Sequence, residues 1–461
     1  MIQPTVAQRV LEAALASGGD FAEIFWEDTE INQVHMIDDK IDTATHKRRH
    51  GAGIRVLCGT NCVYVYTADT HERELLRVAR AAAAAVAAGT PAAVLPFAAK
   101  QYETVPRIPP ERVDNPYRIG LLRRGYRAAR EASADISQVS AAIADVDRRI
   151  QVCNSEGVFA SDRSTRVRLV ISAVASRAGE AQTGTQGPGA GVGYEAFERI
   201  DIEQAGKRAA EQALTMLSAP ECPAGRFPVV IGGGFGGVIF HEACGHSLEA
   251  TSVSKGNSEF CGKLGQVIAA PCVTAVDDGT IPGEWGSVHI DDEGTPTQKN
   301  VLIENGVLKG YMIDRLGSRR MGMPVTGSSR RESYAYSPTS RMTNTYIAAG
   351  QDDDEEMLRT MGEGLYARSM GGGSVNPLTG EFNFSVDEGY WVRDGRILTP
   401  VRGATLIGKG SQVLTRIDRV GREVSLGQGM CGSASGNVAV NVGQPQIRVS
   451  ELTVGGKGEA L

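Results

Sequence analysis

Two histidines, a glutamate and a cysteine lie within six positions of the stretch GFGGVIFHEACGHSLEAT, residues 234–251, in a chain with seven histidines in all. Imidazole nitrogens are common metal ligands, and zinc peptidases place their general base directly after the first histidine of such a motif. His241, Glu242 and His246 therefore indicate a metal site that activates water. Their spacing, H-E-x-x-x-H, is one residue longer than the familiar H-E-x-x-H.

The extra residue constrains the backbone between the two histidines. In a regular α-helix positions i and i+4 differ by about 40° around the axis, whereas i and i+5 differ by about 140°. His241 and His246 could not bind one ion from such a helix and would then be unrelated polar residues. A single π-type turn makes i and i+5 neighbours, and such turns concentrate at functional sites. We therefore predict a π-turn here, with Gly245 as the residue that most easily accepts the distortion.

A third ligand is needed, because a catalytic zinc site usually has three protein ligands and an open position for water. Cys244 would point away from the face that His241 and His246 share, so we interpret it as a packed thiol. Glu249 is a feasible ligand or a hydrogen-bond partner of one. Cys431, in GQGMCGSASGN, has the small neighbours of a tight loop that could approach an ion. The residues alone leave Glu249 and Cys431 both open.

The glycines before the motif allow a second interpretation. GGGFGG follows the apolar run FPVVI and matches the G-x-G-x-x-G turn of dinucleotide-binding folds. The rest of that fingerprint fails, because TSVSKGNSEFCGKLGQ stands where a second apolar strand ending in an acidic residue should follow. We expect the glycines to form a sharp turn close to another backbone, within the fold or in a bound ligand.

Turn and periodicity patterns divide the chain near Pro220. Residues 1–219 alternate helical patterns with hairpins such as GIRVLCGTNCVYVYTA, and the order helix then meander occurs twice, which suggests an internal duplication. Residues 220–461 are dense in glycine and have few helical patterns after Glu249. We expect an α+β protein with an N-terminal α/β domain of helices and antiparallel meanders. The C-terminal catalytic domain should be mostly antiparallel β, with one prominent helix carrying the motif.

Composition excludes several classes of protein. A formal net charge of −6, with 22% charged residues, gives no electrostatic footprint for nucleic acid. The N-terminus lacks the pattern of a signal peptide, and the most apolar stretch, residues 79–100, is alanine-rich and broken by prolines, unlike a membrane span. Eight cysteines without a C-x-x-C pair are too sparse for a disulfide framework. We expect a cytoplasmic protein that binds neither nucleic acid nor membrane.

The combination of HEACGHSLEAT after GGGFGG with a late GMCGSASG resembles the TldD branch of the TldD/PmbA family of peptidases. The stretches GGDFAEIFWEDTE, PVTGSSRRESYAYSPTSRMTNTYI and EFNFSVDEGYWV are of the same type, so the resemblance covers nearly the whole chain. It implies a metallopeptidase whose third ligand is a distal cysteine, which maps onto Cys431. It also implies a C-terminal domain on a large curved sheet and a two-subunit assembly that encloses the site. The partner would be a homologous TldE/PmbA-type subunit or a second copy of the chain.

The residues and the resemblance together predict a zinc-dependent peptidase, with iron as the alternative metal. The ion held by His241, His246 and Cys431 would polarise the scissile carbonyl and acidify its bound water. Glu242 would take the proton of that water and return it to the leaving amine. We expect unfolded or extended polypeptides as substrates, because an extended chain can add to a sheet edge through main-chain hydrogen bonds.

The oxyanion formed during peptide-bond hydrolysis needs a hydrogen-bond donor besides the metal. Arg330, Arg331, Tyr334 and Tyr336, in SSRRESYAY, are candidates for contact with the substrate. The alternative for each of them is a place in an ordinary polar loop.

Two other functions compete with hydrolysis at the metal. The first is a non-catalytic binding or modulator subunit with a structural metal, since the family is associated by name with modulation of DNA gyrase. Glu242 argues against it, because a structural site has no use for an adjacent base. The second is a thiol hydrolase using Cys431 or Cys244, for which no separate histidine partner is evident.

Overall fold

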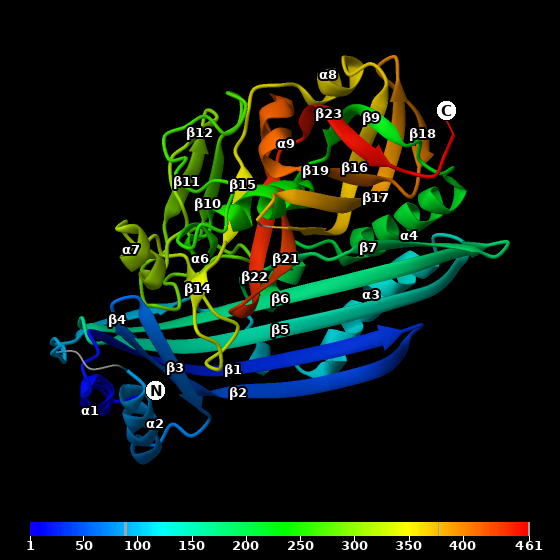
Figure 1. Cartoon of the computed structure of the whole chain (residues 1–461). Helices are drawn as coiled ribbons and strands as arrows, with labels where there is room; N and C mark the ends of the chain where they lie inside the picture. The colour runs from blue at the N-terminus through cyan, green and yellow to red at the C-terminus, as the bar shows by residue number, and fades with distance from the viewer. Residues whose placement is uncertain (87–89, 377, 460–461) are drawn as a thin grey trace.

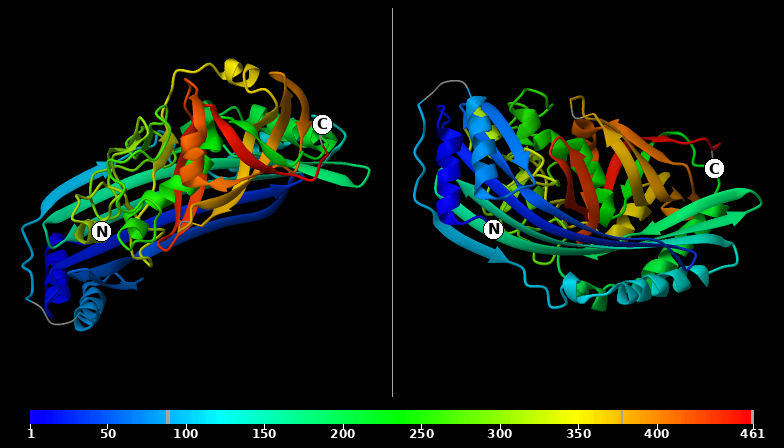
Figure 2. Two further views of the ribbon diagram at one scale, coloured as in Figure 1. Left: turned by 45° about the horizontal axis from the view of Figure 1, so that its top comes forward. Right: turned by 90° about the horizontal axis from the view of Figure 1, so that it is seen from below.

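The computed structural model describes residues 1–86, 90–376 and 378–459. Its first half forms one long curved sheet that underlies the rest of the molecule (Figures 1 and 2). The strand order is β3-β2-β1-β5-β6-β4, and β7 and β8 also pair with β6. The bounds are β1 Phe21–Ile37, β2 Lys40–Cys58, β3 Asn61–Thr67, β4 Ala98–Glu103, β5 Ile136–Asn154, β6 Val158–Arg177, β7 Glu180–Gln186 and β8 Gly189–Ala190. The hairpin expected in GIRVLCGTNCVYVYTA is confirmed as the turn between β2 and β3.

Four helices accompany this sheet in two pairs. The helices α1 (Pro4–Leu15) and α2 (Glu72–Ala84) share one apolar cluster with β1 and β2. The helices α3 (Asn115–Arg130) and α4 (Ile202–Ser218) share a second one with β5 and β6. The chain thus runs helix, antiparallel strands, helix twice over, in the order that the sequence suggests. Part of the alanine-rich stretch 79–100, residues 87–89, lies outside the described residues.

The second half of the chain builds two further sheets above the first (Figure 1). A six-stranded sheet has the order β12-β11-β10-β15-β22-β21, and a seven-stranded sheet has β16-β9-β23-β19-β17-β18, with β20 paired to β23. Most pairs are antiparallel, as expected, while β15–β22 and β9–β16 are parallel. The bounds are β9 Gly225–Ile231, β10 Ala275–Asp278, β11 Lys299–Glu304, β12 Val307–Leu308, β15 Asn344–Ile347, β16 Gly364–Val375, β17 Glu381–Arg393, β18 Arg396–Val401, β19 Thr405–Lys409, β20 Ile417–Val420, β21 Ser425–Ser433, β22 Gly436–Gln444 and β23 Ile447–Gly455.

The helices of this half are short. They are α5 Val238–Phe240, α6 Ala250–Val253, α7 Arg315–Met321, α8 Asp354–Arg359 and α9 Gly410–Arg416, and a two-stranded ribbon joins β13 Ser329–Arg330 to β14 Thr339–Ser340. The motif-bearing helix is present between residues 234 and 248, but it changes its hydrogen-bonding pattern along its length. Among the described residues, no helix has the length and apolar character to cross a bilayer.

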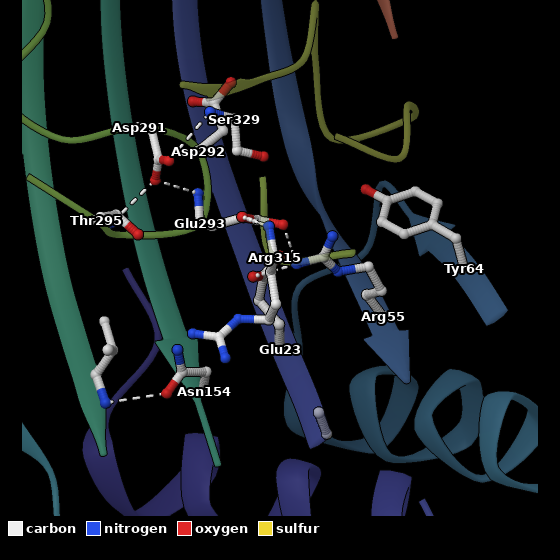
Figure 3. A network of polar contacts seen from close by, with 12 residues as sticks. Glu23, Arg55, Tyr64, Asn154, Asp291, Asp292, Glu293, Thr295, Arg315 and Ser329 are labelled. Atoms are coloured by element: carbon white, nitrogen blue, oxygen red, sulfur yellow. Dashed lines mark hydrogen bonds and ion pairs between the residues drawn. The ribbon is translucent and has the colours of Figure 1, made fainter. Parts of the chain in front are cut away.

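A buried ionic network joins the two halves of the chain (Figure 3). Arg55 of β2 lies between two carboxylates, with Nη2 2.9 Å from Glu23 Oε2 and 2.6 Å from Glu293 Oε1. Arg331 donates to the other oxygen of Glu23 at 2.8 Å, so Glu23 binds one arginine from each half. Burial alone would raise the pKa of Glu293, but Arg55 and Arg315 lower it. Each charge here depends on a partner, because an unpaired buried charge is strongly destabilising.

The glycine-rich loop before the motif lies against backbone of the six-stranded sheet. A Cβ on Gly237 would be 2.4 Å from the carbonyl oxygen of Gly443 in β22, and one on Gly236 would be 2.8 Å from Gln444 Nε2. The expected close approach to a partner backbone therefore occurs within the fold. It seats the motif directly on β22, the strand that follows Cys431.

We expect Gly237→Ala to destabilise the protein by about 3 kcal/mol, because its Cβ would overlap backbone that cannot rotate away. Thermal or denaturant unfolding measures this change. Gly120→Ala is the matched control: its Cβ meets no atom within 4 Å on an exposed face of α3, so alanine should be neutral or stabilising by up to about 1 kcal/mol. Equal stability of the two variants would contradict the close approach.

Candidate metal centre

The residues His241–Gly245 form a single π-turn, as the spacing of the motif predicts. A 3₁₀ turn, Gly234–Gly237, and one α-helical turn, Val238–Phe240, precede it, and a 3₁₀ turn, His246–Leu248, follows. The two imidazole rings lie 5.1 Å apart, centroid to centroid, at 84° to each other. The π-turn thus accommodates the extra residue of the motif, and the rings of His241 and His246 face the same side.

Gly245 has an ordinary right-handed helical conformation, with φ −53° and ψ −53°. Its role is different from the backbone distortion that the sequence suggested. A Cβ at this position would be 2.3 Å from Met342 Sδ, so a larger residue would displace the end of that buried side chain.

The third member of the site comes from the edge strand β21. Cys431 Sγ lies 3.3 Å from His241 Nε2 and 3.2 Å from His246 Nε2. Among the described residues, these three side chains are the group of potential metal ligands whose donor atoms all lie within 4.8 Å of one another. All three residues are buried or nearly so. Two imidazoles and a thiolate are a donor set that suits zinc and leaves a coordination position open.

The surroundings of Cys431 favour the thiolate form of its side chain, which is the form that binds metals. Burial by itself would raise the pKa of Cys431, but the adjacent His241 and His246 lower it to about 4. Cys244, by contrast, is fully buried among apolar side chains, and burial raises the pKa of its thiol well above the usual range. The sequence interpretation of Cys244 as a packed thiol agrees with this environment.

Glu249 contacts the candidate ligand His246 rather than the shared donor cluster. Its Oε2 lies 3.2 Å from His246 Nδ1, on the side of the ring away from Cys431. A carboxylate in this position fixes the tautomer and orientation of a metal-binding histidine. His241 Nδ1 is buried and has no hydrogen-bond partner among the described residues.

Arg341 links both parts of the site, and the sequence analysis missed it. Its fully buried guanidinium donates to the carbonyl oxygens of Cys431 and Gly436 and to Ser435 Oγ, which together hold the β21–β22 turn. Its Nε lies 3.9 Å from Glu249 Oε1. The arginine thus connects the cysteine strand to the carboxylate behind His246. The sequence offers no signal for this, because Arg341 stands in an ordinary polar run.

Glu242 is on the accessible side of the motif. Its side chain is 26% exposed, against 12% for His246, and Oε2 lies 3.6 Å from His246 Nε2. It makes no close ion pair with an arginine or lysine among the described residues. A carboxylate next to the donor cluster and open to solvent can reach a water molecule held there.

The four residues of SSRRESYAY occupy different environments. Arg330 is buried and donates to the Met342 carbonyl oxygen, while Arg331 is bound to Glu23. The Tyr334 ring lies against Gly51 of the first sheet. Tyr336 is 38% exposed. No hydrogen bond or ion pair described in this structure joins any of the four to the three candidate ligands.

Comparison with known proteins agrees with this geometry. Residues 22–86, 108–217 and 224–456 match the first, central and C-terminal domains of the PmbA/TldA metallopeptidases. The chain belongs to the TldD/PmbA family. It is a metallopeptidase, a hydrolase of peptide bonds, as the names of its relatives indicate.

The similarity to individual members spans almost the full length. The chain is 37% identical to a metalloprotease TldD homologue of Haemophilus influenzae over 95% of this chain and 93% of the relative. It is 30% identical to a metalloprotease of Methanocaldococcus jannaschii over 93% and 96%. The crystal structure of TldE from Thermococcus kodakarensis, at 18% identity, has the same fold, with a TM-score of 0.77 over 97% of this chain and 99% of that one.

In metal-free protein, Cys431 should be the thiol most readily alkylated at pH 6, since a pKa of about 4 keeps it ionised there. Its rate should change little between pH 6 and 8, whereas Cys244 should react only on unfolding. Added Zn²⁺ should slow the reaction at Cys431 and leave that at the exposed Cys62 unchanged. Mass spectrometry of labelled peptides measures each site, and no protection by Zn²⁺ would contradict the assignment of Cys431.

Proposed function

We propose that the chain is a zinc-dependent peptidase whose ligands are His241, His246 and Cys431 and whose general base is Glu242. The observation that carries this proposal is the convergence of the three side chains from the π-turn and from β21, with the partly exposed Glu242 beside them. A structural zinc site usually closes all four positions with protein ligands. Three donors with an adjacent carboxylate favour catalysis over a structural or modulator role.

The donors fit zinc better than the other common metals. A thiolate and two imidazoles select zinc among the divalent ions that bind protein side chains, with iron as the alternative. When bound, the ion acts as a Lewis acid that polarises the scissile carbonyl and lowers the pKa of a water molecule in the open position. Glu249 and Arg341 keep His246 and Cys431 in the geometry that this requires.

Proton transfer falls to Glu242. Its carboxylate accepts the proton of the attacking water and then donates it to the nitrogen of the departing amine, so that one residue serves both half-steps. The oxyanion donor is proposed among Arg330, Arg331, Tyr334 and Tyr336. Tyr336 is the member of this set with the most exposed side chain, whereas Arg331 already binds Glu23.

The substrate is proposed to be an extended or unfolded polypeptide bound along β21. This strand lies at the end of the six-stranded sheet and carries Cys431. Gln428 lies opposite Asn441, whose N–H donates to Thr343 on the far side of β22. The main-chain groups of Gln428 and, by alternation, of Met430 and Gly432 therefore point to the open side of β21. An extended chain could pair there beside the metal.

A two-subunit assembly is also proposed, with a TldE/PmbA-type homologue or a second copy as the partner. The support is the shared fold with TldE and the family membership. The proposal of a cytoplasmic location rests on the composition and on the absence of a disulfide framework in the sequence.

Glu242→Ala should keep its metal and its thermal stability but lose at least about 100-fold in kcat, because the base is removed without loss of a ligand. His241→Ala, His246→Ala and Cys431→Ala should lose metal and activity together. Metal analysis of the purified variants beside peptide-cleavage assays measures both. A Glu249→Ala variant that lost its metal while Cys431→Ala kept it would make Glu249 the third ligand.

An unfolded protein should be cleaved at least about tenfold faster than its folded form, because strand pairing needs a free main chain. The measurement uses one small disulfide-bonded protein in native and in reduced, carboxymethylated form, so that the sequence is unchanged. Cleavage sites should show broad tolerance of side chains. Equal rates for the two forms would contradict binding of the substrate as a strand.

A further inference from the structure

A cavity of about 640 Å³ lies between the two halves of the chain, next to the strand that carries Cys431. Its walls come from β6, β7 and α4 of the first half and from β16, β17 and β21 of the second. Phe235 and Gln428 line it on the side of the metal centre, and Arg168 lines it on the side of the first sheet. Gln428 is three residues from Cys431, about 10 Å along an extended strand.

Arg168 is a charged side chain of this cavity that forms no ion pair with any described residue. Its Nε donates to the Gly187 carbonyl oxygen at 3.1 Å and its Nη2 to the Gln428 carbonyl oxygen at 2.9 Å. The guanidinium lies 5.7 Å from the centre of the Trp285 ring, and no carboxylate of the described residues forms an ion pair with it. Burial lowers its pKa, as expected for a cation that lacks a counter-charge. Its Nη1 has no described partner.

The other charged side chains of the cavity do not neutralise Arg168. Asp201 accepts a hydrogen bond from the Gln204 N–H as the N-cap of α4, and burial raises the pKa of Asp387. Arg208 adds a second positive charge on α4. A ligand carboxylate at Arg168 would supply the missing counter-charge through a charge-assisted hydrogen bond from Nη1.

The position of Arg168 also limits how far a substrate strand can pair with β21. The Gln428 carbonyl oxygen points to the open side of the strand and is already taken by Arg168. Pairing can therefore run past Gly432 and Met430 but meets the guanidinium at Gln428. A substrate strand paired with β21 would therefore end opposite Gln428 or turn a side chain toward Arg168.

We propose that Arg168 forms a carboxylate-binding subsite for the peptide, about three residues from the scissile bond. The proposal rests on the peptidase function proposed above and adds to it a preference for substrates that carry a carboxylate at this position. The carboxylate can come from the C-terminus of a short substrate or from an Asp or Glu side chain within a longer one. Both sources present the same planar group to the guanidinium.

The test compares peptides that differ in one carboxylate. Unstructured twelve-residue peptides carry a single Glu at successive positions, or Gln at the same positions, with free or amidated C-termini. Cleavage sites are read by mass spectrometry. We expect kcat/KM to be about tenfold higher with Glu than with Gln at one position, about three residues from the cleaved bond. A C-terminal source would instead show as loss of rate on amidation.

The arginine is tested by Arg168→Gln, for which the ratio of Glu to Gln rates should fall to about 1, and by Arg168→Lys, which keeps the charge and should keep part of the preference. Arg177→Gln is the matched control, since Arg177 lies on the same strand but is exposed and paired with Asp135. In Arg177→Gln the ratio of Glu to Gln rates should stay at the wild-type value. Bound metal and the unfolding midpoint of each variant report whether the site is intact.

Absence of any carboxylate preference in the wild-type protein, or its persistence in Arg168→Gln, overturns the subsite. Binding of the same peptides to Glu242→Ala, followed by fluorescence anisotropy, separates this result from a failure of the proposed peptidase activity. A tenfold difference in Kd that depends on Arg168 supports the subsite even if no peptide is hydrolysed. Equal Kd values for the Glu and Gln peptides, together with equal Kd values for free and amidated C-termini, refute it even if hydrolysis is rapid.

Discussion

The convergence of His241, His246 and Cys431 is the constraint on which the site depends. Histidines five positions apart can share an ion only through a π-turn, and the thiol must arrive from a strand 185 residues beyond His246. Both conditions depend on the packing of the motif against β22, where Gly237 allows contact with the backbone of Gly443. The metal centre is therefore a product of the C-terminal half as a whole rather than of one helix.

Buried arginines hold the parts of this arrangement together. Arg341 fixes the turn that presents Cys431 and lies close to Glu249 behind His246. Arg331 and Arg55 bind Glu23 and Glu293 and so attach the C-terminal half to the long first sheet. Removal of one partner would leave an uncompensated charge in a dry interior, which makes each contact specific as well as stabilising.

The first sheet contributes more than support for the catalytic half. It supplies Arg168 to the cavity beside β21 and Glu23 to the ionic network. Arg168 lies on β6 and Glu23 on β1, so different strands of the one sheet reach the two regions. A binding surface formed by both halves of the chain can select peptides by their length and charge. The metal centre alone could not make this selection.

The sequence by itself determined the motif, the π-turn, the packed state of Cys244 and the alternation of helices and strands, because these follow from local spacing and side-chain periodicity. It left the third ligand open between Glu249 and Cys431, and only the family resemblance favoured the cysteine. The tertiary structure decided how these residues meet: Cys431 lies beside both imidazoles, while Glu249 lies behind one of them. It alone revealed Arg341 and Arg168, because their partners are carbonyl oxygens and carboxylates far away in the chain, which no local pattern encodes.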